Sequence, residues 1–102
     1  MNAKVAVIGI VRFPPERVQD IRPHIRVLVE ATRKNDGCIA YDVAEDLFDP
    51  GLLRFSELWP DEESLARHAV APHIKPWHEA ANLCGQMEKR FYVIQAGDIK
   101  VV

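Results

Sequence analysis

The stretch "KVAVIGIVRF", residues 4–13, decides the fold because it is apolar on both of its faces. Two sets of residues alternate along it: Val5, Val7 and Val11, and between them Ala6, Ile8 and Ile10. Successive side chains of a β-strand point to opposite faces of its sheet, and a strand with one face in water shows polar residues at alternate positions. We therefore expect a strand here, with protein packed against each of its faces.

The next segment predicts one long amphipathic helix. Its apolar residues recur at intervals of three and four, as along one face of an α-helix: Val18, Ile21, Ile25, Leu28, Val29 and Thr32. Gly37 in "NDG" can adopt the left-handed conformation that ends helices. Pro23 lies inside the pattern and predicts either a kink or a helix that starts just after Asp20.

A hairpin is predicted after this helix. Residues 38–46, "CIAYDVAED", and 52–59, "LLRFSELW", each have alternating patterns typical of strands. Pro50 and Gly51 between them indicate a loop longer than two residues. The two strands should pair antiparallel, and one row of the second strand should face the helices: Leu53, Phe55, Glu57 and Trp59.

Two short helices and a strand complete the chain. Asp61 can cap a helix that ends before Pro72, a second helix is expected over residues 72–84, and residues 89–96 form a last strand. The order βαββ(αα)β with right-handed crossovers predicts a single domain over residues 1–102. Its fold class is α+β, a ferredoxin-like βαββαβ sandwich with an antiparallel sheet and its helices on one face.

This arrangement leaves one face of the first strand without a cover. A second copy of the chain, packed sheet to sheet, would bury it. A domain of 102 residues also gains from a partner, since alone it buries only about two-thirds of its unfolded surface. We therefore expect a homodimer joined through the sheet face.

Composition and charge exclude several classes of function. Hydrophobic residues make up 48% of the chain and charged residues 27%, as in ordinary globular proteins. The formal charge is -2 and the basic residues are scattered, so we expect no nucleic-acid partner. The first apolar run is far shorter than the roughly 20 residues that span a bilayer, so we expect a cytoplasmic protein without membrane contact. Cys38 and Cys84 fit no zinc or disulfide motif.

Three longer motifs carry a resemblance to a known family: "RPHIRVLVEATRKNDGC" at 22–38, "LRFSELWPDEESLARH" at 53–68 and "APHIKPWHEA" at 71–80. They resemble the antibiotic biosynthesis monooxygenase family, whose members are ferredoxin-like dimers with facing sheets, that is, dimeric α/β barrels. The resemblance implies a cofactor-free oxygenase that acts on quinols or polycyclic aromatics. The family also includes relatives that process a quorum-sensing signal, and haem-degrading members.

The haem-degrading members place their iron-ligating histidine where this chain has His78. The chain departs from their pattern at two positions. The tryptophan that they carry ten residues earlier is His68 here, and their first-strand asparagine is Gly9.

Three histidines, His68, His73 and His78, lie within eleven residues. At about 100° per residue, steps of five separate them around a helix, and Pro72 divides the first two. They are not the i, i+4 pair of a helical zinc site. We expect no metal, and, without Gly-rich nucleotide loops, no cofactor.

His68 and Glu57 are both predicted to lie between the helices and the sheet. A buried histidine needs a hydrogen-bond partner, and we expect Glu57 to supply it. The pair is then either a structural contact or a catalytic one, in which Glu57 orients His68 and raises its pKa for base catalysis.

Aromatic and histidine side chains should surround this pair: Tyr41, Phe55, Trp59, His73, Trp77 and His78. They either form core alone or bind a planar ligand. The predicted function is a cofactor-independent monooxygenase that acts on a quinol or another small aromatic substrate, by base-assisted activation of that substrate toward dioxygen. The alternatives are a non-catalytic dimer that binds small aromatic ligands, and a haem-binding relative.

Overall fold

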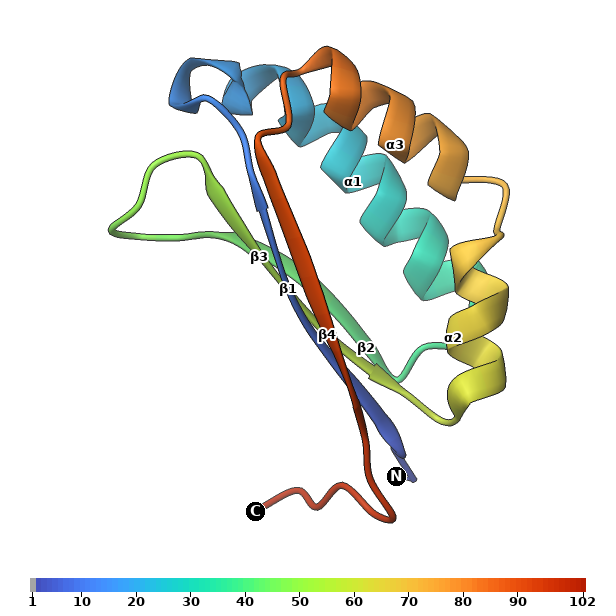
Figure 1. Cartoon of the computed structure of the whole chain (residues 1–102). Helices are drawn as coiled ribbons and strands as arrows, with labels where there is room; N and C mark the ends of the chain where they lie inside the picture. Colours follow the sequence, from blue (N-terminus) through green and yellow to red (C-terminus); the bar gives the residue numbers. More distant parts are fainter. Residues whose placement is uncertain (1) are drawn as a thin grey trace.

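The computed structural model describes residues 2–102, which form a four-stranded antiparallel sheet with three α-helices on one face (Figure 1). In chain order the elements are β1 (Val5–Arg12), the 3-10 helix η1 (Pro15–Arg17), α1 (Val18–Asn35), β2 (Ala40–Glu45), β3 (Leu52–Trp59), α2 (Glu62–Ala69), α3 (Ile74–Leu83) and β4 (Glu88–Gln95). None of the helices within residues 2–102 combines the length and apolarity needed to cross a membrane.

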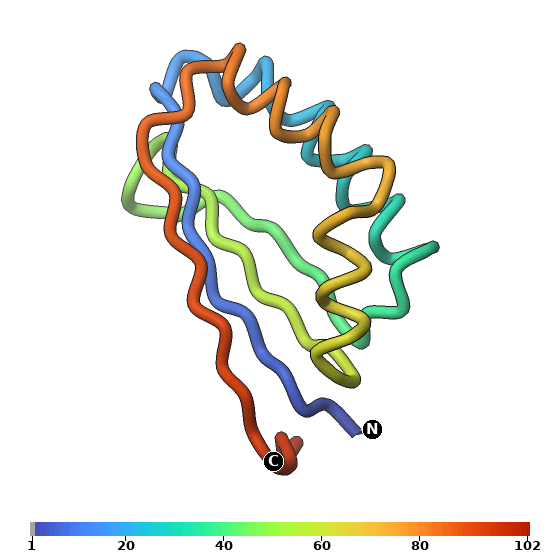
Figure 2. Tube along the Cα trace, turned by 45° about the vertical axis from the view of Figure 1, so that its right-hand side comes forward, coloured from blue at the N-terminus to red at the C-terminus, as the bar shows by residue number. Residues whose placement is uncertain are grey.

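The strands lie in the order β2-β3-β1-β4, and every neighbouring pair is antiparallel. β1 is therefore paired along both edges, with β3 on one side and β4 on the other, as the chain trace in Figure 2 shows. The predicted hairpin is present as β2 and β3. These observations confirm the ferredoxin-like α+β fold expected from the sequence.

Helix α1 starts earlier than one prediction allowed. It runs from Val18 and includes Pro23, so the predicted start after Asp20 is wrong. A proline inside a helix removes one backbone hydrogen bond, but Val18 and Ile21 are buried in the first turns and keep this segment on the core. At the other end Gly37 has a φ of 75°, the left-handed conformation that was predicted.

A turn around Pro72 separates α2 from α3. The Asp61 side chain caps α2 as predicted, because it accepts a hydrogen bond from the backbone N–H of Ser64. Helix α3 begins at Ile74 rather than at residue 72 and includes Pro76 in its first turn, where the missing N–H has no intrahelical partner to lose. Helix α3 packs against α1, and α2 against β3 (Figure 1).

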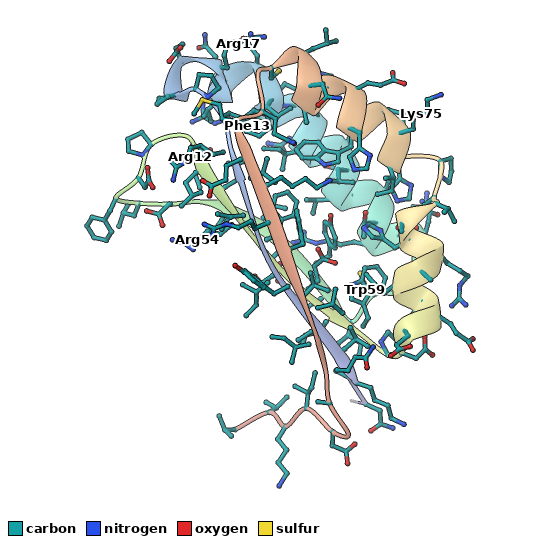
Figure 3. The ribbon with its side chains drawn as sticks, viewed as in Figure 1. Arg12, Phe13, Arg17, Arg54, Trp59 and Lys75 are labelled. Carbon is teal, nitrogen blue, oxygen red and sulfur yellow. The ribbon has the colours of Figure 1, made fainter. Side chains whose placement is uncertain are left out.

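The core lies between the sheet and the helices. The inward row predicted for β3 is confirmed, since all four of its members are buried: Leu53, Phe55, Glu57 and Trp59. Trp59 points from the sheet toward α2 (Figure 3). The same face of β1 adds Val5, Val7 and Val11 to the core.

The opposite face of the sheet carries no helix in the described part of the chain. Ile8 on β1 is 54% exposed, and Tyr92 and Ile94 on the neighbouring β4 are 58% and 45% exposed. Arg12 and Arg54 project on this side of the sheet (Figure 3). The face is therefore an apolar surface with charged residues near one end.

Gly9 allows Phe91 to lie across the helix-facing side of β1. The two residues are directly opposite each other in the β1–β4 pair, and a Cβ at Gly9 would lie 2.3 Å from the Phe91 ring. Phe91 meets Phe55 edge to face, with the ring centroids 5.2 Å apart. Because glycine has no side chain, the Phe91 ring can lie over Gly9 and pack against Phe55.

We expect Gly9→Ala to lower the free energy of unfolding by about 1–3 kcal/mol, the usual cost of overpacking, because the added methyl overlaps the Phe91 ring. Gly97→Ala is the control, since nothing lies within 4 Å of a Cβ at that position. Urea denaturation measures both. The double variant Gly9→Ala, Phe91→Ala should be less destabilised than the sum of its single changes, and additive losses would contradict the explanation.

Candidate functional site

A cavity of about 300 Å³ lies between the helices and the sheet. Its lining combines aromatic and aliphatic side chains with a few polar ones: Val11, Tyr41, Phe55, Glu57, Leu65, His68, Ala69, Ile74, Trp77, His78, Gln86, Lys89 and Phe91. All the site residues predicted from the sequence line it except Trp59 and His73. Those two residues lie outside the lining. Trp59 packs beside the ring of His68, and His73 binds the same carboxylate as His68, as described below.

A second hollow, of about 370 Å³, lies between α1 and β2. Its arginines are largely engaged by neighbouring carboxylates: Arg22 binds Glu45 through two hydrogen bonds, and Arg33 binds Asp42. This hollow has no histidine and no aromatic side chain in its lining. The candidate site is therefore the cavity that His68 lines.

The strands arrange the floor of the cavity in three rows. Glu57 is level with Val7, Phe55 and Phe91 are level with Gly9, and Lys89 is level with Val11. Because consecutive rows are two residues apart along β1, they are separated by about 7 Å. Polar side chains thus occupy both ends of the cavity floor, and aromatic rings lie between them.

His68 reaches the cavity from α2, with its ring beside two aromatic side chains. The ring centroid is 5.2 Å from that of Tyr41 and 4.9 Å from that of Trp59. Its Nδ1 lies 2.6 Å from Oδ2 of Asp36, the residue that caps the C-terminus of α1. The predicted partner, Glu57, is therefore wrong, and the partner is Asp36.

The same carboxylate oxygen binds a second histidine. Nε2 of His73, the residue that precedes α3, lies 2.7 Å from Oδ2 of Asp36. The side chains are nearly buried, with exposed fractions of 5% for Asp36 and 10% for each histidine. An ionised carboxylate can only accept hydrogen bonds, so Nδ1 of His68 and Nε2 of His73 donate. This Asp–His–His cluster (Asp36, His68 and His73) joins the ends of three helices.

Glu57 has a different partner, which explains why it does not bind His68. Its Oε1 accepts a hydrogen bond of 2.8 Å from Nε1 of Trp59. Trp59 lies two residues along β3 and therefore on the same face of the strand. Burial raises the pKa of Glu57, and the Trp59 bond opposes this only in part. Burial, and then the charge of Glu57, raise the pKa of Tyr41, so its phenol stays protonated.

The Asp–His–His cluster also offers the donor atoms of a metal site. These atoms all lie within 4.8 Å of one another, so the helical-angle argument, which kept the histidines apart, is wrong for His68 and His73. The turn at Pro72 breaks the helix and brings His73 back to Asp36. The nitrogen–oxygen separations are nevertheless those of hydrogen bonds, whereas two ligands of a tetrahedral zinc ion are about 3.3 Å apart. The absence of a bound metal stays a prediction, which elemental analysis tests.

The other end of the cavity is polar as well. His78 on α3 lines it, and its pKa is lowered by burial and then by the positive charge of Lys89. The asparagine that haem-degrading members carry on the first strand has no room here, since Phe91 covers Gly9. In this chain the Phe91 ring occupies the space that a side chain at position 9 would need.

Sequence reasoning missed four polar or aromatic residues of the site: Asp36, Gln86, Lys89 and Phe91. The motif "NDG" around Asp36 was interpreted only as a helix stop. The alternation of Lys89 and Phe91 with their neighbours on the last strand was a usable signal, because it puts both side chains on one face. Asp36 had no such signal, since its partners are 32 and 37 residues away.

We expect Asp36→Ala to lower the free energy of unfolding by about 2–3 kcal/mol, because it leaves two nearly buried imidazole N–H groups without their acceptor. Glu45→Ala is the matched control: it removes an exposed ion pair with Arg22 and should cost less than about 1 kcal/mol. Chemical denaturation followed by circular dichroism measures both. Equal stabilities of the two variants would show that the cluster does not hold the helices.

Comparisons with known proteins agree with this fold. The family model described as "Antibiotic biosynthesis monooxygenase" matches residues 4–80. A solved structure of an antibiotic biosynthesis monooxygenase is 32% identical, with a TM-score of 0.83 over 90% of this chain and 97% of that chain. A conserved protein of Methanosarcina mazei is 30% identical, with a TM-score of 0.83 over 92% of this chain and 93% of that one.

More distant relatives share the fold. A candidate antibiotic biosynthesis monooxygenase of Deinococcus radiodurans is 24% identical and has a TM-score of 0.87 over 96% of this chain and 97% of that chain. An uncharacterized protein of Synechocystis is 24% identical over 75 residues, which are 74% of this chain. The chain spans about half of that relative's length, 51%. Since the family model matches the chain from β1 into α3, this protein belongs to the antibiotic biosynthesis monooxygenase family.

Proposed function

We propose that this protein is a cofactor-independent monooxygenase that oxidises a quinol or another small aromatic substrate with dioxygen, and that His68 is its general base. One observation carries the proposal: His68 lines an aromatic cavity while its Nδ1 is held by a nearly buried carboxylate. Membership of the family supports the reaction class.

The second ring nitrogen of His68, Nε2, is available to a ligand, and His68 lines the cavity. Nε2 has no hydrogen-bond partner in the described part of the chain. It is not cut off from solvent either, since the only fully buried side-chain nitrogen or oxygen without a partner in residues 2–102 is Oγ1 of Thr32. With Nδ1 protonated and bound to Asp36, Nε2 carries the lone pair. A phenolic hydroxyl in the cavity can therefore give its proton to Nε2.

Asp36 would support this step in two ways. It fixes the tautomer and the orientation of the imidazole, and its negative charge stabilises the imidazolium that forms, as the carboxylate does in hydrolase triads. His73 holds the same carboxylate oxygen from the other side. Asp36 and His73 are thus positioning residues, and of these three residues only His68 contacts the substrate.

The aromatic substrate supplies the electrons. A deprotonated hydroquinone is a strong donor, so it can reduce dioxygen without a cofactor. Overall, one oxygen atom enters the ring and the other leaves as water, and the hydroquinone provides all four electrons as it becomes a hydroxyquinone. The protein contributes proton transfer, orientation between Phe55, Phe91 and Trp77, and exclusion of water.

His68→Ala should lower turnover about a hundredfold or more, the usual contribution of a general base. His24→Ala is the control, because His24 is exposed on α1 and far from the cavity. An oxygen electrode measures consumption across a panel of quinols and phenols, and a thermal melt of the same samples reports folding. A folded His68→Ala protein that keeps full activity would reject His68 as the base.

The same panel distinguishes the alternatives. Ligands that bind without oxygen consumption would favour a non-catalytic binder of small aromatic molecules. A haem titration with a Soret shift that is lost in His78→Ala would favour a haem-binding relative, since His78 also lines the cavity.

We further propose that the protein is a homodimer joined through the helix-free sheet face. Ile8, Tyr92 and Ile94 expose a continuous apolar surface on neighbouring strands. An isologous contact covers such a surface with itself, and the burial of apolar area drives it.

Ile8→Glu should convert the dimer into a monomer at micromolar concentration, because it places two charges in the apolar contact. Val27→Glu is the matched control, since Val27 is 63% exposed on α1 and lies on the other side of the molecule. Size-exclusion chromatography with light scattering gives the masses. A monomeric wild-type protein, or an Ile8→Glu protein that stays dimeric, would contradict this contact.

A further inference from the structure

The two ends of the cavity differ in chemistry. The first end carries His68, Glu57 and Tyr41, and the second carries Gln86, Lys89 and His78. The proposed reaction uses only the first end. The second end therefore needs its own explanation, and this explanation rests on the proposed function.

Lys89 supplies the positive charge of the second end. It lies opposite Val11, on the helix-facing side of β4, and its Nζ is 6.0 Å from the centroid of the Phe91 ring. Phe91 belongs to the next row toward Glu57, so the lysine stem leans along the cavity. The ammonium group consequently lies beside the central aromatic row, within reach of a ligand that occupies it.

The charge of Lys89 is not neutralised by the described part of the chain. The neighbouring acid, Glu88, points to the opposite face of β4 and pairs with Arg12 and Arg90. The only carboxylate in the cavity lining, Glu57, is bound to Trp59. No carboxylate of residues 2–102 lies within 4.0 Å of the lysine nitrogen.

The reach of Lys89 toward the first end suits one substituted ring. The rows of Glu57 and Lys89 are four residues apart along β1, but the ammonium lies beside the Phe91 ring, whose row is only two residues, about 7 Å, from that of Glu57. A benzene ring that carries a carboxylate meta to a hydroxyl group spans a similar length between the oxygen atoms of the two groups. That hydroxyl group can face His68 while the carboxylate lies close to Lys89.

We infer that the cavity takes an aromatic substrate that carries a carboxylate as well as its hydroxyl groups, and that Lys89 is the residue that selects it. The carboxylate accepts a charge-assisted hydrogen bond from the ammonium, and Gln86 and His78 complete a polar end around it. The charge of Lys89 also acts on His78, whose pKa is lowered by burial and then by Lys89.

The test compares two ligands that differ only in the acidic group, hydroquinone and 2,5-dihydroxybenzoate. Quenching of tryptophan fluorescence reports binding, because Trp77 lines the cavity, and the absence of oxygen prevents turnover. Wild-type protein should bind 2,5-dihydroxybenzoate about five- to tenfold more tightly than hydroquinone, as expected for a partly exposed charge pair. Added salt should reduce this preference.

Lys89→Met keeps the apolar stem and removes the charge, so it should abolish the preference and leave the affinity for hydroquinone unchanged. Lys89→Gln is a second variant with the same expected result. Lys75→Met is the matched control, because Lys75 points away from the cavity on the outer side of α3 (Figure 3) and should keep the preference.

The outcomes separate this inference from the proposed function. Equal affinity of wild-type protein for both ligands, or a preference that survives in Lys89→Met and Lys89→Gln, overturns the role of Lys89 even if quinols are oxidised. If neither ligand binds, the inference fails, while oxygen consumption across the panel of quinols and phenols decides the proposed function separately. Loss of the preference in both Lys89 variants, with hydroquinone binding intact, supports the inference.

Discussion

A single carboxylate oxygen, Oδ2 of Asp36, fixes how the helices lie over the sheet. It accepts hydrogen bonds from His68 on α2 and from His73 at the start of α3, while Asp36 itself ends α1. The break at Pro72 makes this geometry available, since a continuous helix would rotate His73 away from His68. The cavity depends on this contact, because the position of α2 sets the ring of His68 beside Tyr41 and Trp59.

The fold could be predicted from the sequence because its signals are local. Alternation identified β3 and its inward row, the spacing of three and four identified α1, and Gly37 marked the helix end. The partner of His68 could not be predicted in the same way. Glu57 faces inward and is close to His68 in sequence, but its carboxyl group accepts a hydrogen bond from the indole N–H of Trp59 instead. Asp36 reaches His68 only once α1 and α2 have packed, and no periodicity encodes that distance.

The polar lining of the cavity makes the core less stable than a wholly apolar one would be. Glu57 lies in a row that would otherwise be wholly apolar, and burial raises its pKa because it penalises the charged form. A carboxyl group in a core is less favourable than an apolar side chain of the same shape unless it is well bonded. Glu57 has one such bond, from Trp59. Sites that break the rules of a stable core are the places where function is expected.

The edge position of β4 makes the cavity wall the least anchored part of the sheet. Both faces of β4 are largely exposed, and its backbone is paired only with β1. Strands with few buried side chains open by local unfolding at a lower free-energy cost than the whole domain. Such an opening would move Phe91 and Lys89 away together and admit a ligand from the edge of the sheet. A partner that covered Tyr92 and Ile94 would keep β4 paired with β1. The eight residues of β4 would then control both the entry of a ligand into the cavity and the assembly of the protein.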